Sequence, residues 1–302
     1  MRLAVAATPE VAVPTLNWLL TSEHDLVRVI SQPDKPSGRG QEVHSSAVSQ
    51  WAKSNSKDLV TPSNVSEIDE AIADVDLLIT IGYGRILPST TLSIPKFGCI
   101  NLHFSLLPKY RGAAPVQRAI EAGERESGVS VFALDPGMDT GPIYTSITTP
   151  IESTMRSFEL LEKLSYVGVD AVKRALEAIG NGVLPTQQIG QGSLAAKITR
   201  DEAQLKWSST ANSLVNKIRA FYPQPQAWTV FRGQPLKISL ARVSNEAPVL
   251  QPGQLRVIGS DCFIGCMDNA IALERVTPAG KKEMSALDWS RGARFESTER
   301  CG

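Results

Sequence analysis

The sequence of 302 residues has few cysteines and histidines, and their spacing indicates neither disulfides nor a metal site. The four cysteines form no Cys-x-x-Cys pair, and the three histidines are scattered. These residues are Cys99, Cys262, Cys266, Cys301, His24, His44 and His103. Disulfide frameworks and zinc sites both need such residues at regular intervals. We therefore expect a reduced, cytoplasmic protein that holds no metal.

Long hydrophobic runs are also missing from the sequence. No apolar run approaches the ~18 residues that a membrane-spanning helix needs. The apolar start, residues 1–7, is stopped by Pro9 and Glu10, too early for a secretory signal, so we expect a buried first strand there. With 42% hydrophobic and 21% charged residues, the chain can still bury a sizeable core. These features predict a globular protein without a membrane segment.

Glycine-rich phosphate-binding loops are absent from the positions where nucleotide enzymes carry them. The turn after the first apolar run, residues 6–10, contains no glycine, and no Gly-x-x-x-x-Gly-Lys-Ser/Thr sequence occurs. The formal match to Gly-x-Gly-x-x-Ala at residues 190–195 lies in a stretch that we expect to be a connector. Nicotinamide and ATP chemistry are therefore poorly supported.

The net charge is zero, but the charges are unevenly distributed. Residues 1–204 carry 18 Lys and Arg against 23 Asp and Glu, whereas residues 205–302 carry 13 against 8. A basic C-terminal part is typical of proteins with a polyanionic partner. Ordinary variation of surface charge also explains a difference of this size, and the arithmetic alone slightly favours it.

The first half of the chain alternates short apolar runs with stretches that have the apolar spacing of helices. The runs rich in Val, Ile and Leu are residues 2–8, 25–32, 76–83, 99–104 and 129–135. The helical stretches are residues 10–20, 45–54, 115–122 and 155–179. This alternation predicts an α/β fold, a Rossmann-like and mostly parallel sheet with helices on both faces.

The C-terminal part has a different pattern. Residues 183–205 resemble a connector because they contain Gly190, Gly192 and Ser193 before a charged stretch. A helix at residues 210–221 precedes short strands at residues 228–232, 236–243, 254–258, 262–267 and 270–276. Several short strands within ~80 residues suggest a small OB-like β-barrel. We predict a first domain over residues 1–182, a linker over 183–205 and a barrel domain over 206–302.

Two polar residues interrupt the apolar run at residues 99–104. Asn101 and His103 are two positions apart, so in a strand they project from the same face. They lie near its C-terminal end, where open α/β sheets place ligands. A single buried His is more often structural, but an Asn–His pair at this place favours a binding site.

Asp139 lies in a loop rich in glycine and proline, residues 134–142, after the next predicted strand. A turn-forming role is common for Asp, and the spacing alone does not decide between that role and a catalytic one. Asn101, His103 and Asp139 together supply what acyl transfer to an amine needs: a donor for a developing oxyanion, a general acid or base, and a carboxylate that orients the imidazole. No Ser or Cys nucleophile is evident, which favours direct transfer between two bound substrates.

These segments resemble the signature of the folate-dependent formyltransferases. The motifs are Asn101-Leu102-His103, Ser105-Leu106-Leu107-Pro108, Arg111-Gly112-Ala113-Ala114-Pro115 and Asp139-Thr140-Gly141. The match continues with residues 32–40, 218–223 and 278–284, and it covers nearly all of residues 1–292. It is similar in particular to the members whose acceptor is methionine carried by tRNA.

The resemblance implies transfer of a formyl group from 10-formyltetrahydrofolate to the α-amino group of methionine on initiator tRNA, by direct attack through a tetrahedral intermediate. It implies catalytic roles for Asn101, His103 and Asp139. Folate binding is implied for Ser105, Leu106, Leu107, Pro108, Arg85, Ile86 and Leu87, and tRNA binding for Lys35, Arg39, Arg219, Lys281 and Lys282. We expect no metal, no membrane association and a monomer.

Several other interpretations stay open at this point. A formyltransferase that acts on an amino sugar nucleotide, or a formyltetrahydrofolate hydrolase, would share the same three catalytic residues. Residues 33–44 and the basic C-terminal part favour tRNA as the acceptor. A non-catalytic RNA-binding protein with the shell of an enzyme belongs to a different class, and the presence of all three catalytic residues counts against it.

Overall fold

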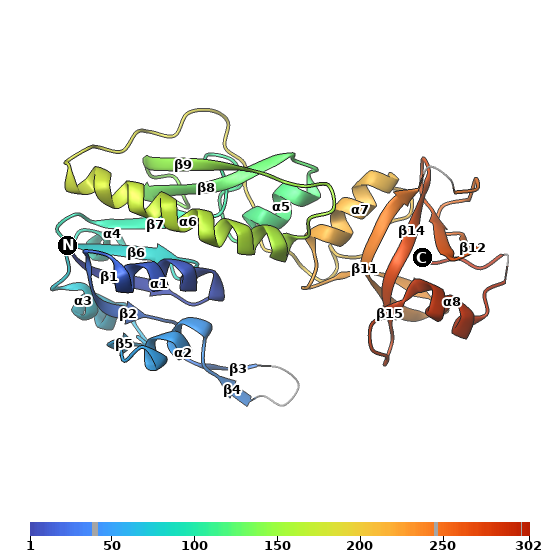
Figure 1. Cartoon of the computed structure of the whole chain (residues 1–302), viewed down its shortest axis with the longest axis horizontal. Coiled ribbons are helices and arrows are strands. Elements are labelled where there is room, and N and C mark those ends of the chain that lie inside the picture. Colours follow the sequence, from blue (N-terminus) through green and yellow to red (C-terminus); the bar gives the residue numbers. More distant parts are fainter. Residues whose placement is uncertain (38–41, 245–246, 297) are drawn as a thin grey trace. The chain divides into compact units, whose positions relative to one another are not determined.

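The computed structural model describes residues 1–37, 42–244, 247–296 and 298–302, and the chain separates into two units (Figure 1). The first unit contains residues Met1–Pro115, Glu126–Pro150 and Leu161–Ala195. The second contains residues Val116–Arg125, Ile151–Leu160 and Ala196–Gly302. The division at a linker over residues 183–205 stays a prediction.

A seven-stranded sheet forms the centre of the first unit (Figure 1). Its strands, in spatial order, are β5 (Leu59–Val60), β2 (Asp25–Ile30), β1 (Arg2–Ala7), β6 (Leu77–Ile81), β7 (Cys99–His103), β8 (Glu126–Ala133) and β9 (Ile143–Pro150). The pairs from β5 to β7 are parallel, whereas β8 and β9 run antiparallel to their neighbours. The predicted Rossmann-like, mostly parallel sheet is confirmed.

Helices cover this sheet, and several begin at side-chain caps. Ser46 accepts a hydrogen bond from Ser49 N before α2, and Asn64 accepts one from Glu67 N before α3. The helices are η1 (Glu10–Ala12), α1 (Val13–Thr21), α2 (Ala47–Ser54), α3 (Val65–Ile72), α4 (Ser89–Leu92) and α6 (Ser157–Gly180), whose residues from Leu161 onward belong to this unit. Ala4 and Ala6 of β1 pack with the apolar side of α3. Small side chains on β1 allow this close packing.

Strand alternation determines the direction of the polar residues of β7. Leu102 contacts α6, where a Cβ on Gly168 would lie 2.6 Å from the Leu102 side chain. Asn101 and His103 therefore project from the opposite face of the strand, away from α6. This is the face on which the candidate site lies.

A hairpin follows β2 in the first unit. Its strands are β3 (Lys35–Ser37) and β4 (Glu42–His44), which pair with Lys35 opposite His44. Arg39 lies outside the described residues.

The second unit contains an antiparallel sheet in the order β10-β11-β14-β13-β12, with β15 paired to β14. The strands are β10 (Ala227–Phe231), β11 (Gln234–Ser244), β12 (Leu255–Ile258), β13 (Asp261–Gly265), β14 (Ala270–Pro278) and β15 (Met284–Ser285). The helices are α5 (Pro115–Glu121), whose residues from Val116 onward belong to this unit, α7 (Ala211–Ala220) and α8 (Ala286–Ala293). Phe231, Trp289 and Phe295 pack edge to face in its core.

The last residues of the chain join the two edge strands of this sheet. Cys301 bridges Phe231 of β10, and Arg300 bridges Gln254, the residue before β12. Leu255 N also donates to Glu299 O, at 2.9 Å, and Gly302 N donates to Val230 O, at 3.0 Å. Because the tail pairs with both edges, the sheet closes into a small barrel, as the OB-like prediction requires.

All four cysteine thiols are buried and reduced. Burial raises the pKa of Cys99, Cys262, Cys266 and Cys301 to about 12. Among the residues whose positions the structure gives, no group of three or more His, Cys, Asp or Glu could hold a metal ion. Within the same ranges no helix is long and apolar enough to cross a membrane.

Candidate active site

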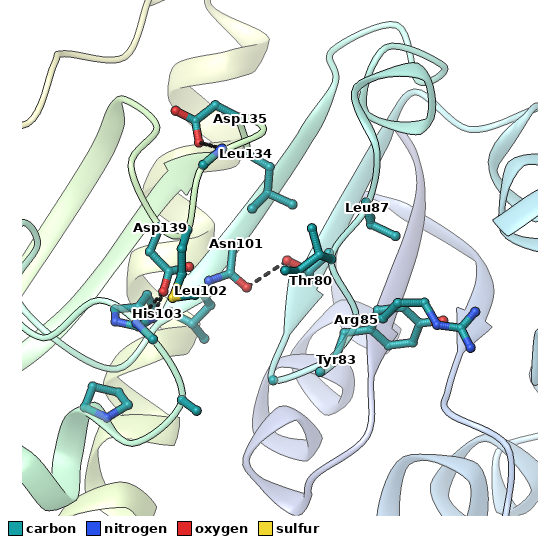
Figure 2. Close-up of a pocket in the computed structure, with 18 of the residues that line it drawn as sticks. Thr80, Tyr83, Arg85, Leu87, Asn101, Leu102, His103, Leu134, Asp135 and Asp139 are labelled. Carbon is teal, nitrogen blue, oxygen red and sulfur yellow. Dashed lines mark hydrogen bonds and ion pairs between the residues drawn. The ribbon is translucent and has the colours of Figure 1, made fainter. Parts of the chain in front are cut away.

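Asn101 and Thr80 are neighbours on parallel strands, and their side chains are hydrogen-bonded. β6 and β7 pair with Thr80 opposite Asn101. The Thr80 hydroxyl lies 2.7 Å from Asn101 Oδ1 and 3.2 Å from Ile100 O (Figure 2). With Oδ1 accepting from Thr80, the Asn101 amide has its Nδ2 hydrogens left to donate. Thr80 thus sets which end of the amide serves as donor toward a ligand.

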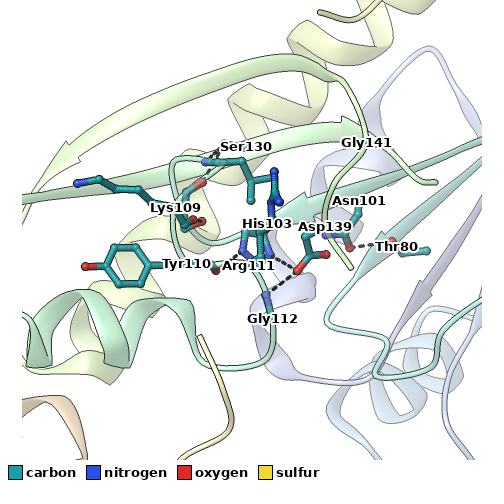
Figure 3. Close-up of polar contacts among 12 residues, drawn as sticks. Thr80, Asn101, His103, Lys109, Tyr110, Arg111, Gly112, Ser130, Asp139 and Gly141 are labelled. Atoms are coloured by element: carbon teal, nitrogen blue, oxygen red, sulfur yellow. Dashed lines mark hydrogen bonds and ion pairs between the residues drawn. The ribbon is translucent and has the colours of Figure 1, made fainter. Parts of the chain in front are cut away.

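His103 ends β7 and is only 6% exposed. Its Nε2 lies 2.9 Å from Tyr110 O, and its Nδ1 lies 3.7 Å from Asp139 Oδ2 (Figure 3). A carbonyl oxygen only accepts, so Nε2 carries the hydrogen and the lone pair of the neutral ring is on Nδ1. Burial lowers the pKa of His103 below its ordinary value, while Asp139 and the Tyr110 carbonyl oppose that shift. The resting imidazole is therefore uncharged near neutral pH.

Asp139 is held in its loop by backbone geometry and by one hydrogen bond. Its φ of +54° lies in the left-handed region, which Asp adopts more readily than most residues. Two residues later, a Cβ on Gly141 would lie 1.8 Å from Ala133 O, so only glycine fits there. Gly112 N donates to Asp139 Oδ2 at 2.7 Å, which fixes the carboxylate beside His103.

Asn101, His103 and Asp139 line one cavity of about 420 Å³. Its lining also includes Tyr83, Gly84 and the predicted residues Arg85, Ile86 and Leu87, together with Gly112, Ala113 and Pro115 (Figure 2). Ile86 is 78% exposed, although it is apolar. The Tyr83 hydroxyl is buried and finds no hydrogen-bond partner among the described residues. An exposed apolar side chain beside a cavity is a feature that a bound ligand would cover.

Ser105, Leu106, Leu107 and Pro108 follow β7 and form the loop beside the cavity. Over the described part of the chain, the lining of the cavity does not include them. The Ser105 hydroxyl donates to Lys109 O at 2.6 Å, and Ser130 Oγ donates to Ser105 O at 2.8 Å. These bonds tie the segment to β8 and to its own turn, so its contribution is to shape the loop that follows β7. That these four residues contact folate stays a prediction.

The segment expected to be a connector reaches the site. Arg111 N donates to Ser193 O at 2.8 Å, and Ala195 N donates to Arg111 O at 2.6 Å. A Cβ on Gly112, whose φ is +115°, would lie 3.0 Å from Ala195 O. This close approach explains why glycine stands there, and it places residues 193–195 against the Arg111–Gly112 turn. Sequence analysis did not predict the pairing of residues 193–195 with Arg111. The segment contains glycines and a serine, which are typical of a connector, and it lacks the alternation of apolar residues that is typical of a strand.

The residues predicted to bind tRNA have different surroundings. Lys281 and Lys282 are exposed in the turn between β14 and β15. Lys35 lies in β3, and Arg39 falls outside the described residues. Arg219 corrects the expectation: it is 8% exposed, and its guanidinium donates to Glu152 O, Met155 O and Asn216 Oδ1. Because its donors are used inside the second unit, Arg219 is not available to a phosphate.

Comparisons with known proteins agree with this geometry. A family model described as formyl transferase matches residues 1–178, and one described as formyl transferase, C-terminal domain, matches residues 197–294. The methionyl-tRNA formyltransferase of Salinispora tropica is 39% identical over 306 residues, which cover 99% of each chain.

Two solved structures share the fold. HypX from Aquifex aeolicus in complex with tetrahydrofolic acid has a TM-score of 0.67 at 18% identity, covering 96% of this chain and 46% of HypX. The N-formyltransferase from Helicobacter canadensis, in complex with folinic acid and dTDP-3-aminofucose, has a TM-score of 0.67 at 23% identity, covering 90% of this chain and 98% of that one. At these identities the likeness shows the fold alone.

Proposed function

The chain belongs to the formyltransferase family, among the methionyl-tRNA formyltransferases, and we propose that its cavity is where the formyl group is transferred to the α-amino group of methionine on initiator tRNA. The observation that carries this proposal is the meeting of Asn101, His103 and Asp139 at one cavity. The donor is 10-formyltetrahydrofolate, which supplies the formyl carbon and a nitrogen leaving group.

The cavity is suited to the folate. Its volume of about 420 Å³ lies within the usual range for small-molecule sites, ~300–1,000 Å³. Leu87, Leu92 and Leu134 supply apolar walls for a flat ring system. We assign Arg85, Ile86 and Leu87 to this binding surface.

We assign proton transfer to His103. Its Nδ1 carries the lone pair and can accept the proton that the attacking amine loses. The imidazolium then lies 3.7 Å from the Asp139 carboxylate, which stabilises the new charge. The same proton can return to the departing nitrogen.

We assign stabilisation of the developing oxyanion to Asn101. When the amine attacks, the formyl oxygen gains negative charge, and the Nδ2 hydrogens of Asn101 are the donors that Thr80 leaves free. The Thr80 bond holds the amide before the reaction, so little reorganisation accompanies the charge. Thr80 also lines the cavity, and we assign it a positioning role because its hydroxyl holds the Asn101 amide.

For the acceptor, we propose that Lys35, Arg39, Lys281 and Lys282 contact the tRNA. Lys281 and Lys282 are exposed in a turn of the basic C-terminal part. Positive side chains on such a surface attract phosphates without reading sequence. A cytoplasmic location and a monomeric state belong to the same proposal, and light scattering during gel filtration tests the latter.

A comparison of acceptors tests the function. The purified protein is given 10-formyltetrahydrofolate with initiator Met-tRNA, with an amino sugar nucleotide, or with neither. We expect rapid formylation of Met-tRNA, and no reaction with the same tRNA carrying N-acetylmethionine, whose amine is blocked. Faster formylation of the sugar nucleotide, or equal loss of the formyl group to water, would reject tRNA as the acceptor.

A further inference from the structure

Residues 186–195 form a strap that is bonded at both ends to the loops of the candidate site. At one end, Ile143 N donates to Thr186 O at 2.7 Å, and Thr186 N donates back to Ile143 O at 2.9 Å. At the other end, Leu194 pairs with Arg111 in a parallel bridge. The strap therefore connects the start of β9 with the turn after β7.

Gln188 lies between Thr186 and Leu194, and its side-chain amide both donates and accepts hydrogen bonds. Its Nε2 donates to Asp139 O at 2.9 Å and to Gly141 O at 2.8 Å. Its Oε1 accepts from Arg111 Nη2 at 2.6 Å and from Arg111 Nε at 3.2 Å. Carbonyl oxygens only accept and a guanidinium only donates, so the orientation of this amide is unambiguous.

The two groups that Gln188 binds, the Arg111 side chain and the Asp139 carbonyl, both belong to the segments that position the Asp139 carboxylate beside His103. Arg111 precedes Gly112, whose N–H binds Asp139 Oδ2 (Figure 3). Asp139 itself has a backbone φ of +54°, a conformation that needs support from its surroundings. By binding the Asp139 carbonyl and the Arg111 side chain together, Gln188 keeps the carboxylate 3.7 Å from His103 Nδ1.

We propose that Gln188 is a positioning residue for formyl transfer, acting through Asp139. This inference rests on the proposed function of the same site. A catalytic group displaced by ~1 Å loses about 10²-fold in rate, so holding Asp139 at this distance has a measurable effect on turnover.

The test compares Gln188→Leu with the matched control Gln187→Leu, an exposed glutamine one position earlier. We expect kcat for Met-tRNA formylation to fall about 10- to 100-fold in Gln188→Leu, with the KM for 10-formyltetrahydrofolate unchanged within about twofold. Gln187→Leu should keep the kcat of the original protein. Gln188→Glu keeps the acceptor for Arg111 but loses the donors to Asp139 and Gly141, and its kcat should fall as well. Full kcat in Gln188→Leu, or in Gln188→Glu if the leucine variant does not fold, overturns the proposal.

A second measurement separates positioning from general loosening of the fold. In a protein that already carries Asp139→Asn, adding Gln188→Leu should lower kcat by less than about threefold, because the group through which it acts is gone. Multiplication of the two losses would mean that Gln188 acts independently of Asp139, and would reject the inference. Absence of Met-tRNA formylation by the original protein would reject the proposed function, whereas formylation by the original protein together with full kcat in Gln188→Leu would reject this inference alone.

Discussion

The two units of the chain place their polar side chains in opposite ways. In the first unit, His103 is buried and bonded at Nε2, and Asn101 and Asp139 each have a fixed hydrogen-bond partner. In the second unit, Lys281 and Lys282 are exposed in a turn. Each side chain of the first site is held in one position by its partner. The proposed role of the two lysines depends only on their charge, which a cation at a nearby surface position would also supply. Single substitutions should therefore be severe in one unit and mild in the other.

The largest expected effect is loss of a catalytic side chain. We expect Asn101→Ala, His103→Ala and Asp139→Ala each to lower kcat at least ~100-fold, since loss of one oxyanion donor alone costs ~2.7–4 kcal/mol in the transition state. Single-turnover formylation of Met-tRNA measures this, with circular dichroism as the check on folding. A folded variant with near-normal turnover would remove that residue from the mechanism.

A smaller effect is expected at Thr80, whose hydroxyl donates to Asn101 Oδ1. Thr80→Val keeps the shape but removes the hydroxyl, and a lost hydrogen bond of ~0.5–1.5 kcal/mol corresponds to about 2- to 10-fold in kcat. The KM for the folate should not change. Thr80→Ser restores the hydroxyl and should restore turnover, whereas equal loss in Thr80→Ser would indicate a packing role.

The pH dependence tests whether His103 begins uncharged. The burial-lowered pKa of His103 lies below 6.5, and only the neutral ring accepts a proton. The single-turnover rate should therefore rise with pH, reach half its maximum below pH 6.5 and become flat above that. Asp139→Asn removes the carboxylate that raises this pKa, so the residual rate of that variant should reach half its maximum at a still lower pH. A shift in the other direction would contradict the assigned roles.

The mildest effect should come from the second unit. Replacing Lys281 and Lys282 by Ala should raise the KM for tRNA a few-fold, leave kcat unchanged and reduce the slope of log affinity against log salt by about one to two. Arg219→Met is the contrast: it should leave that slope unchanged but lower the free energy of unfolding by ~1–3 kcal/mol, because it leaves buried acceptors unpaired. A reduced salt slope in Arg219→Met would return that residue to the tRNA surface.

The sequence predicted the buried part of this architecture well. The strands β1, β2, β6 and β7 coincide with apolar runs that the local sequence alone identifies. Asn101 and His103 were identified because they are polar residues within such a run. β9, with the sequence IYTSITTP, was missed because most of its residues are only partly buried and its pattern resembles a loop. The direction of β8 was also not predictable, since a strand pattern does not encode how its neighbour runs.

The residues that support the site could not be predicted from the sequence, because their roles depend on contacts between distant segments. Thr80 matters only because the register of two strands sets it opposite Asn101. Gln188 lies 49 positions from Asp139, in a stretch whose composition is typical of a linker. Arg219 looked like a surface cation, yet the packing of α7 turns it inward. Local patterns report which residues are buried, whereas these contacts depend on which segments meet.

The four buried thiols make it possible to measure local opening of the structure. Cys99 lies in the first unit, on the strand that carries Asn101, whereas Cys262, Cys266 and Cys301 lie in the second. With pKa values near 12, they react with alkylating reagents only when the surrounding structure opens. Mass spectrometry of peptides gives the rate of labelling at each cysteine. This rate would measure how often each unit opens locally, without the introduction of any probe.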